Sequence, residues 1–284
     1  LGYTNRYKDN LSYFNIDTAE TLYKIQSNYN FLNLNNKEQK EDSIVFCVKD
    51  LNYLKFKQIT EISCANIENY RTAIDSLVLK FKIIRAGDPS NNIFHYENSK
   101  NFKDHTKNKK YFELMFDSFF QSKYYFGTGG SQSYIGLFSN SERYISNSID
   151  YCALESSFSN LNFCIFKYIF YKKKERFLSI NEIYQEGHFF KIFENRNDYI
   201  FVENDKDEIN NLAKILISKN KSEYIDLNLM KEFNEIRQQN FIKFKLKNKE
   251  EYFRLIKNCK INIPKFFLQN TMNYGTYLKE KTNK

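Results

Sequence analysis

The sequence predicts an α+β protein, in which an N-terminal mixed region with a small antiparallel sheet precedes an all-α helix bundle. The period of the apolar residues predicts this division. Before residue 96 apolar and polar residues alternate, as in a strand with one buried face, whereas after residue 110 apolar residues recur every three or four positions. The chain of 284 residues is 42% hydrophobic and 18% aromatic, so it can bury a core built largely from Phe and Tyr.

The mixed region is expected to span residues 1–107. A helix is predicted over residues 18–29, and a short strand is predicted at Ile44–Val48, where β-branched and aromatic residues gather. A longer strand is predicted across residues 73–83, and it would end at the Ala-Gly-Asp-Pro turn at 86–89. The residues that define its alternation are Ala73, Asp75, Leu77, Leu79, Phe81 and Ile83. Two to four antiparallel strands are therefore expected.

The helix bundle is expected to span residues 108–240. Amphipathic or apolar patterns predict helices over residues 112–120, 141–158, 161–172, 180–201, 206–219 and 229–236. The helix at 161–172 is apolar nearly all round, so it would lie at the centre of the bundle. The Gly-Thr-Gly-Gly-Ser segment at 127–131 is interpreted as a linker between helices, because a P-loop would need a Lys directly after its glycines.

Positive charge is concentrated in a basic C-terminal extension, residues 241–284. This extension contains eleven Lys and Arg against three acids, a local balance of +8 in a chain whose net charge is +9. A basic surface suits nucleic acid, and aromatic residues between the cations can stack on bases. A solvated lysine-rich tail is the alternative interpretation. The side chains predicted to bind RNA are Lys243, Lys245, Lys247, Lys249, Arg254 and Lys257.

Cysteine and histidine usage predicts neither disulfides nor a metal site. The five cysteines are scattered without a C-x-x-C pair, and the chain has three histidines. We therefore expect buried thiols in a protein of the reducing cytoplasm, with no cofactor and no metal. The most apolar run, residues 161–171, is too short to cross a bilayer and is interrupted by Lys167, so no membrane segment is expected.

The segment 191–201 carries the most specific pattern, because Arg196 and Asn197 come shortly before Phe201. Upstream lie an Ala-Leu-Glu segment at 153–155 and the apolar run at 161–172, and downstream an acidic start at 205–208 opens a regular helix. In this order of elements, residues 108–240 resemble HEPN domains, in particular the ApeA-like group. The equivalent helix of those domains closes on Arg-x-x-x-x-His, often Arg-Asn-x-x-x-His.

The resemblance implies a helix bundle that forms a homodimer and cleaves RNA without a metal. In such a site an Arg stabilises phosphate charge and a His transfers protons. Arg196 and Asn197 match the motif as catalytic residues, but Phe201 stands at the His position and can do neither job. His188 lies eight residues before Arg196, on the wrong side to replace the missing histidine. Phenylalanine at the His position predicts a degenerate domain, which binds RNA or a partner protein without cutting RNA.

Two other functions stay open at this point, so the chain is not assigned as an enzyme or a non-enzyme. It could be an active endoribonuclease that uses Arg196 with another base. Alternatively, it is a structural subunit of a larger ribonucleoprotein or defence complex, with the basic extension against RNA or another subunit. All three hypotheses expect RNA, a second copy or a larger complex as the partner.

Overall fold

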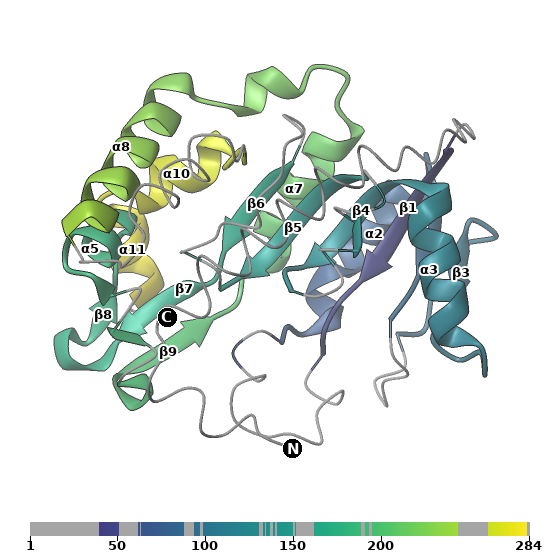
Figure 1. Ribbon diagram of the computed structural model, residues 1–284, viewed down its shortest axis with the longest axis horizontal. Coiled ribbons are helices and arrows are strands. Elements are labelled where there is room, and N and C mark those ends of the chain that lie inside the picture. The colour runs from purple at the N-terminus through teal and green to yellow at the C-terminus, as the bar shows by residue number, and fades with distance from the viewer. Residues whose placement is uncertain are drawn as a thin grey trace.

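The centre of the protein is a parallel sheet of six strands in the order β3-β2-β1-β4-β5-β6 (Figure 1). The computed structural model describes residues 40–50, 64–87, 99–130, 141–149, 162–188, 195–243 and 261–282, with short pieces between them. Every neighbouring pair of strands in this sheet is parallel. The strands are β1 (Glu41–Cys47), β2 (Lys82–Arg85), β3 (Phe102–Asp104), β4 (Ser122–Thr128), β5 (Glu142–Ser148) and β6 (Phe163–Phe166).

Helices cover both faces of the sheet, as burial of an all-parallel sheet requires. Tyr125 and Phe126 are neighbours in β4, so their side chains point to opposite faces. The ring of Phe126 packs on Tyr70 with centroids 6.1 Å apart, while Tyr125 stacks on Phe119 at 5.7 Å. Phe119 lies in α3 (Tyr111–Gln121), and Tyr70 ends η4 (Ile67–Tyr70), which leads into α2 (Arg71–Leu77). Helix α7 (Lys206–Ile217) packs against α2 and β5 on the Phe126 side.

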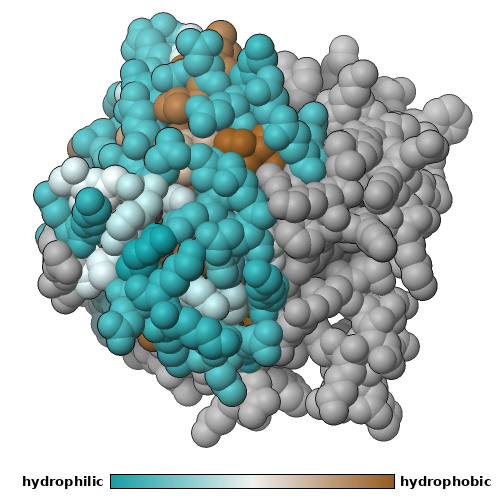
Figure 2. All heavy atoms as spheres, turned by 90° about the vertical axis from the view of Figure 1, so that its left-hand side faces the viewer, coloured by the Kyte–Doolittle hydropathy of each residue, from teal (hydrophilic) through white to brown (hydrophobic). Residues whose placement is uncertain are grey.

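A second, antiparallel sheet of order β8-β7-β9 follows β6. Its strands are β7 (Tyr168–Tyr171), β8 (Arg176–Phe177) and β9 (Tyr199–Val202), joined by the 3-10 turns η5 (Lys172–Lys174) and η6 (Arg196–Asp198). Around it lie α5 (Ile180–Gln185), α8 (Leu227–Lys243), α10 (Lys265–Thr271) and α11 (Thr276–Thr282), while η7 (Lys221–Tyr224) connects α7 to α8. Seen from this side, the described surface is mostly hydrophilic with small apolar patches (Figure 2), so these helices turn their apolar residues inward.

The β6 edge of the parallel sheet is covered by a returning piece of chain. Asn262 lies beside Phe163, and its backbone carbonyl accepts a hydrogen bond from the Cys164 amide at 3.0 Å. The Asn262 amide donates in turn to the Asn162 carbonyl at 2.8 Å. This pairing satisfies backbone groups that an open edge would expose. Residues 261–282 are therefore part of the fold, although they belong to the basic extension.

The predicted fold class is wrong. The chain does not form an antiparallel sheet followed by an all-α bundle; it forms an α/β structure whose main sheet is parallel and continues past residue 108. The predicted helices at 141–158 and 161–172 contain β5, β6 and β7 instead. Strands buried on both faces have continuous apolar sequences, which periodicity cannot distinguish from a buried helix. The aromatic and β-branched residues of 163–171 favoured strands, and Lys167 marks the break between β6 and β7.

Two further predicted elements are also wrong in part. Residues 73–83 were expected as one strand, but α2 occupies Arg71–Leu77 and β2 begins at Lys82. Tyr70, Ala73, Ile74 and Leu77 are all buried, and this is the i, i+3, i+4, i+7 spacing of a helix. The predicted helix at 180–201 ends at Gln185 as α5, and its last residues form η6 and β9.

Four elements are confirmed by the structure. β1 contains the predicted strand at 44–48 up to Cys47. Helices α3 and α8 contain the predicted helices at 112–120 and 229–236, and α7 matches the predicted helix at 206–219 up to Ile217. At the start of α7, Asp205 and Glu208 form a reciprocal capping box, which fixes the first turn. The predicted helix at 18–29 lies outside the described residues.

Cys47, Cys64 and Cys164 are buried, as expected, whereas Cys152 and Cys259 lie outside the described residues. None of the helices in the described part of the chain combines the length and the apolar character that crossing a bilayer requires.

A reciprocal pair of asparagines joins the carboxyl end of β5 to the start of α7. The amide of Asn147 donates to Asn204 Oδ1, and the amide of Asn204 donates to Asn147 Oδ1, both at 2.7 Å. Asn147 Nδ2 also donates to the Tyr70 hydroxyl at 3.0 Å. Asn147 has a φ of 54°, in the left-handed region that asparagine tolerates better than most residues. Both asparagines are buried, so these bonds have no competition from water.

Two substitutions at Asn147 separate its hydrogen bonds from its backbone conformation. We expect Asn147→Gly to lower the free energy of unfolding by about 1–3 kcal/mol, because it leaves buried polar groups without partners. Asn147→Ala should lower the free energy of unfolding by roughly 1 kcal/mol more than Asn147→Gly does, because alanine is strained at this φ. Urea unfolding followed by circular dichroism measures both values. Equal losses in the two variants would contradict a role for the left-handed backbone.

Candidate functional site

The residues predicted as a catalytic motif lie on the surface of the small sheet, and not on a helix. Arg196 and Asn197 belong to the single 3-10 turn η6, where Arg196 is partly buried and Asn197 is exposed. Phe201 lies in β9 opposite Ile169 and packs against the core. The strand geometry accounts for Phe201 as a packing residue. The turn has neither the helix nor the histidine on which the predicted chemistry depended.

His188 has a structural role in the same region. Its Nδ1 lies 2.7 Å from the Tyr199 hydroxyl, and its Nε2 lies 2.9 Å from Glu186 Oε2. Burial lowers the pKa of His188, and the hydrogen bond and charge of Glu186 oppose that shift. The imidazole is 2% exposed, so it is not available to a polymeric substrate.

Most of the predicted RNA-binding residues lie outside the described residues. Lys243 ends α8, where only its backbone is described. The other five, Lys245, Lys247, Lys249, Arg254 and Lys257, fall in the segment 244–260, which the structure does not describe.

Polar groups gather where β1 and β4 end, at the centre of the parallel sheet. The Lys49 amide, just after β1, donates to Thr128 Oγ1 at the end of β4 over 3.1 Å. The Tyr125 hydroxyl donates to the Thr128 carbonyl at 2.5 Å. The Lys49 bond joins the carboxyl ends of β1 and β4, and the Tyr125 bond, which lies within β4, fixes the backbone at Thr128. The strand order reverses between them, since β2 and β3 lie beyond β1 while β5 and β6 lie beyond β4.

Glycines make this junction possible. A Cβ on Gly127 would lie 1.9 Å from the Cys47 carbonyl oxygen, and one on Gly87, just after β2, would lie 3.0 Å from Cys47 Sγ. Gly130 has a φ of +121°, which L-amino acids rarely adopt, and a Cβ there would meet no atom within 4 Å among the described residues beyond its chain neighbours. Gly127 therefore permits close strand contact, while Gly130 supplies the positive φ of the loop after β4, where its carbonyl accepts a hydrogen bond from Ser133 Oγ at 2.7 Å.

A buried ion pair holds the neighbouring strand ends. Arg85 Nη1 lies 3.1 Å from Asp104 Oδ2, with the arginine side chain 5% and the aspartate side chain 15% exposed. Thr106 donates to the other Asp104 oxygen through its amide at 2.9 Å and its hydroxyl at 2.6 Å. This pair fixes an arginine at the carboxyl end of β2, where removing either partner would leave a buried charge.

Two lysines with lowered pKa values lie at the same edge. Burial lowers the pKa of Lys49, and the nearby Cys64 opposes the shift. Burial also lowers the pKa of Lys167, whose ammonium donates to the Cys64 carbonyl. Burial raises the pKa of the Cys64 thiol, so this cysteine is unsuited to act as a nucleophile. Glu203 is part of the group too, and its Oε2 accepts from the Asn66 amide at 2.8 Å.

The ammonium groups of Lys49 and Lys167 favour an anionic ligand at this edge, whereas the carboxylates of Asp50 and Glu203, which lie near the same thiol, oppose one. Ammonium groups that have lost hydration gain from a negatively charged ligand, and a glycine loop offers backbone N–H groups that a side chain would otherwise screen. Within the described residues, no group of three or more His, Cys, Asp or Glu side chains could hold a metal ion.

The sequence contains a pattern that indicates this edge of the sheet, but the same residues were assigned to the predicted helix bundle. Three apolar runs each end in glycine or charged residues: Val-Lys-Asp at 48–50, Arg-Ala-Gly at 85–87 and Gly-Thr-Gly-Gly at 127–130. That pattern is typical of parallel strands whose carboxyl ends meet at one edge. The segment at 127–131 was interpreted as a linker between helices, because no Lys follows its glycines and the segments on both sides were predicted to be helical.

Gly127→Ala should destabilise the protein by roughly 2–4 kcal/mol, because the new methyl group would collide with the Cys47 backbone. Gly275→Ala is a matched control, since its Cβ would meet only the Asn273 carbonyl at 4.0 Å. We expect the free energy of unfolding of Gly275→Ala to stay within about 0.5 kcal/mol of that of the parent. Guanidinium unfolding measures both, and similar stabilities for the two variants would contradict the contact.

Comparison of the chain with protein-family models, curated proteins and solved structures finds no match. The comparisons thus provide no support for the resemblance to HEPN domains, and the function has to be inferred from the geometry of the chain.

Proposed function

We propose that the chain binds a phosphate-bearing small ligand of the nucleotide class at the carboxyl edge of the sheet, where β1 and β4 meet. The observation that carries this proposal is the all-parallel strand order β3-β2-β1-β4-β5-β6. In doubly wound sheets of this order, ligands bind outside the carboxyl ends of the strands at the point where the order reverses. That point is the β1–β4 junction.

The residues at the junction favour an anionic ligand. Lys49 directly follows β1, and its backbone amide is hydrogen-bonded to Thr128, while Gly130 gives the loop after β4 a positive φ. The usual glycine fingerprint of dinucleotide sites, which follows β1, is absent here, since Val-Lys-Asp takes that place. The phosphate contacts are therefore assigned to the β4 loop and to the Lys49 ammonium.

Thermal unfolding with ADP, GDP, UDP, CDP and NAD tests the proposal. We expect at least one of these ligands to raise the melting temperature by roughly 3–8 °C at a hundredfold excess over its Kd, because it binds only the folded chain. Lys49→Met keeps the apolar stem but removes the charge, and should weaken binding about 10- to 100-fold in calorimetry.

Lys173→Met is the matched control for Lys49→Met. Lys173 is exposed and pairs with Asp198 on the small sheet at 2.6 Å, so its loss should leave nucleotide binding unchanged. The proposal is wrong if no nucleotide binds at low salt, or if Lys49→Met binds as well as the parent.

RNA binding by the basic extension is a second candidate, favoured by its local balance of +8. Truncation after residue 240 would also disturb the fold, because residues 261–282 cover the β6 edge and pack around the small sheet. A triple Lys→Gln variant at Lys245, Lys247 and Lys249 avoids that problem.

The triple variant should reduce the salt dependence of binding to single-stranded RNA. Each lost phosphate contact lowers the slope of log K against log salt by about 0.7, so a loss of roughly 2 is expected. The control is the triple variant of the exposed lysines Lys107, Lys109 and Lys110, which removes the same charge elsewhere. Equal slopes in the two triple variants would show that net charge alone drives binding.

A further inference from the structure

One face of the small antiparallel sheet carries a continuous set of apolar side chains. Tyr168 and Phe170 are two positions apart in β7, so they point to the same face. Phe170 pairs with Phe177 in β8 and with Ile200 in β9, while Tyr168 pairs with Val202. Paired residues of an antiparallel sheet share a face, so all five side chains lie together.

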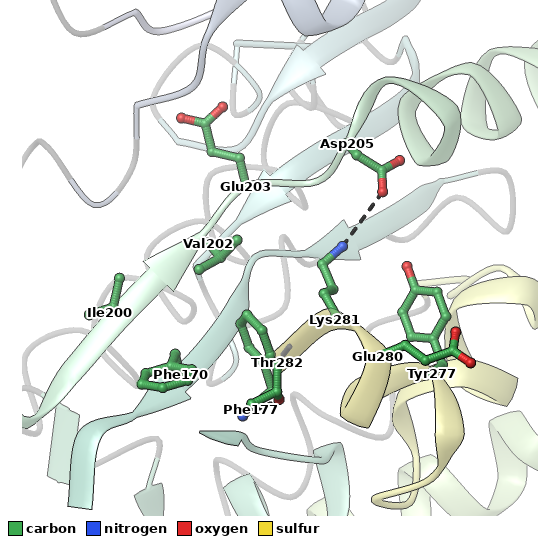
Figure 3. A pocket seen from close by; sticks show the side chains of 10 residues that line it. All are labelled: Phe170, Phe177, Ile200, Val202, Glu203, Asp205, Tyr277, Glu280, Lys281 and Thr282. Atoms are coloured by element: carbon green, nitrogen blue, oxygen red, sulfur yellow. Dashed lines mark hydrogen bonds and ion pairs between the residues drawn. The ribbon is translucent and has the colours of Figure 1, made fainter. Parts of the chain in front are cut away.

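Helix α11 covers only one end of this face, and a pocket lies at the other end (Figure 3). Side chains of α11 pack on the ring of Tyr168, which is 3% exposed. By contrast, Ile200 is 46% exposed, and Phe170 is partly exposed. These two residues, with Phe177 and Val202, form the apolar wall of a cavity of about 540 Å³. A cavity of this size with an apolar wall is typical of small-ligand sites.

Three of the four charged side chains that line the pocket have partners within the protein. The Lys281 ammonium lies 3.6 Å from Asp205 Oδ2 and 3.4 Å from Glu208 Oε2. Figure 3 shows Lys281 directed to Asp205 and away from the apolar wall. Glu203 Oε2 accepts a hydrogen bond from the Asn66 amide at 2.8 Å. These charges are therefore balanced before a ligand arrives, and they do not select an ion of either sign.

The hydroxyl groups of the lining are engaged as well. The Tyr277 hydroxyl donates to Glu208 Oε1 at 2.6 Å, and Thr282 Oγ1 donates to the Leu278 carbonyl at 2.7 Å. The fourth charged residue of the lining, Glu280, is exposed, so water solvates its carboxylate. The pocket therefore attracts a ligand mainly through its apolar wall.

We propose that this pocket binds an uncharged ligand with a flat apolar body, such as a bicyclic aromatic ring. The body would pack against Phe170, Phe177 and Ile200 and remove apolar surface from water. The rings of Phe170 and Phe177 meet edge to face with their centroids 5.5 Å apart, an arrangement that a ligand ring can extend. A charge carried directly on the body would lose part of its hydration without gaining a partner. This site is separate from the proposed nucleotide site and does not depend on it.

Ligand-observed NMR with the full chain tests the proposal, using 2-naphthalenemethanol as the probe. Two analogues share its ring system: 2-naphthylmethylamine is a cation at neutral pH, and 2-naphthoate is an anion. We expect the alcohol to bind with a Kd of about 1 mM or below, and each charged analogue to bind at least about threefold more weakly. Absence of binding at twice that concentration, or a charged analogue that binds as tightly as the alcohol, would overturn the proposal.

One substitution in the wall and a matched one elsewhere locate the bound alcohol. Ile200→Ser shortens the apolar wall at a side chain that already meets solvent, so the alcohol should bind about three- to fivefold more weakly. Phe112→Ser is the control, because Phe112 on α3 is another large apolar side chain that is exposed, and its loss should leave the affinity unchanged. Circular dichroism checks that both variants are folded. Unchanged binding in Ile200→Ser, or weaker binding in Phe112→Ser, would place the alcohol elsewhere and refute the proposal.

Discussion

β1 and β4 lie side by side at the centre of the sheet, and their carboxyl ends are in direct backbone contact. The space that a side chain on Gly127 would need is taken by the Cys47 carbonyl group. The register of this pair sets which face each β4 residue meets, so that Phe126 reaches Tyr70 and Tyr125 reaches Phe119. Strands β2 and β3 lie on one side of this pair and β5 and β6 on the other, so the strand order reverses at this junction. The layers of helices and the candidate site both depend on that contact.

Tyrosine gives this core a polar framework in addition to its packing. The buried hydroxyls of Tyr125, Tyr151 and Tyr184 each donate to a backbone carbonyl, at 2.5–2.6 Å. The hydroxyl of Tyr70 contacts Ser146 Oγ at 2.7 Å and accepts from Asn147. A buried hydroxyl without a partner would cost about 1–3 kcal/mol, whereas a satisfied one fixes the strand or loop that it contacts. Several of these bonds lie at the carboxyl ends of the strands, which makes that edge a defined surface.

The carboxyl edge brings cations and carboxylates together. Lys49 and Lys167 lie close to Cys64, and so do Asp50 and Glu203. Arg85, at the end of the neighbouring strand, is paired with Asp104. On the small sheet, Lys281 is paired with Asp205 and Glu208 in the same way. Charged side chains in both regions are therefore balanced largely within the protein.

Local sequence determined α7 almost completely, because its amphipathic spacing and its capping box involve residues within one or two turns of each other. The strands were harder to predict from sequence, because a short apolar run is compatible with a buried strand or a buried helix until its partners are known. The run at 161–172 could not reveal that Lys167 separates two strands of different sheets. Arg196 and Asn197 matched a helical motif, and Phe201 stood at its His position. The structure places the first two in a turn and Phe201 in β9, which pairs with β7.

For the candidate site, too, local sequence predicted some features and long-range contacts decided the others. The sequence by itself determined its residue types, a lysine after one apolar run and glycines after another. Only the tertiary structure decided that Lys49 and Thr128 meet, and that Gly127 must lack a side chain, because both facts depend on the pairing of strands about 80 positions apart. Such long-range pairing is selected by burial of both sheet faces together, and local periodicity does not encode it.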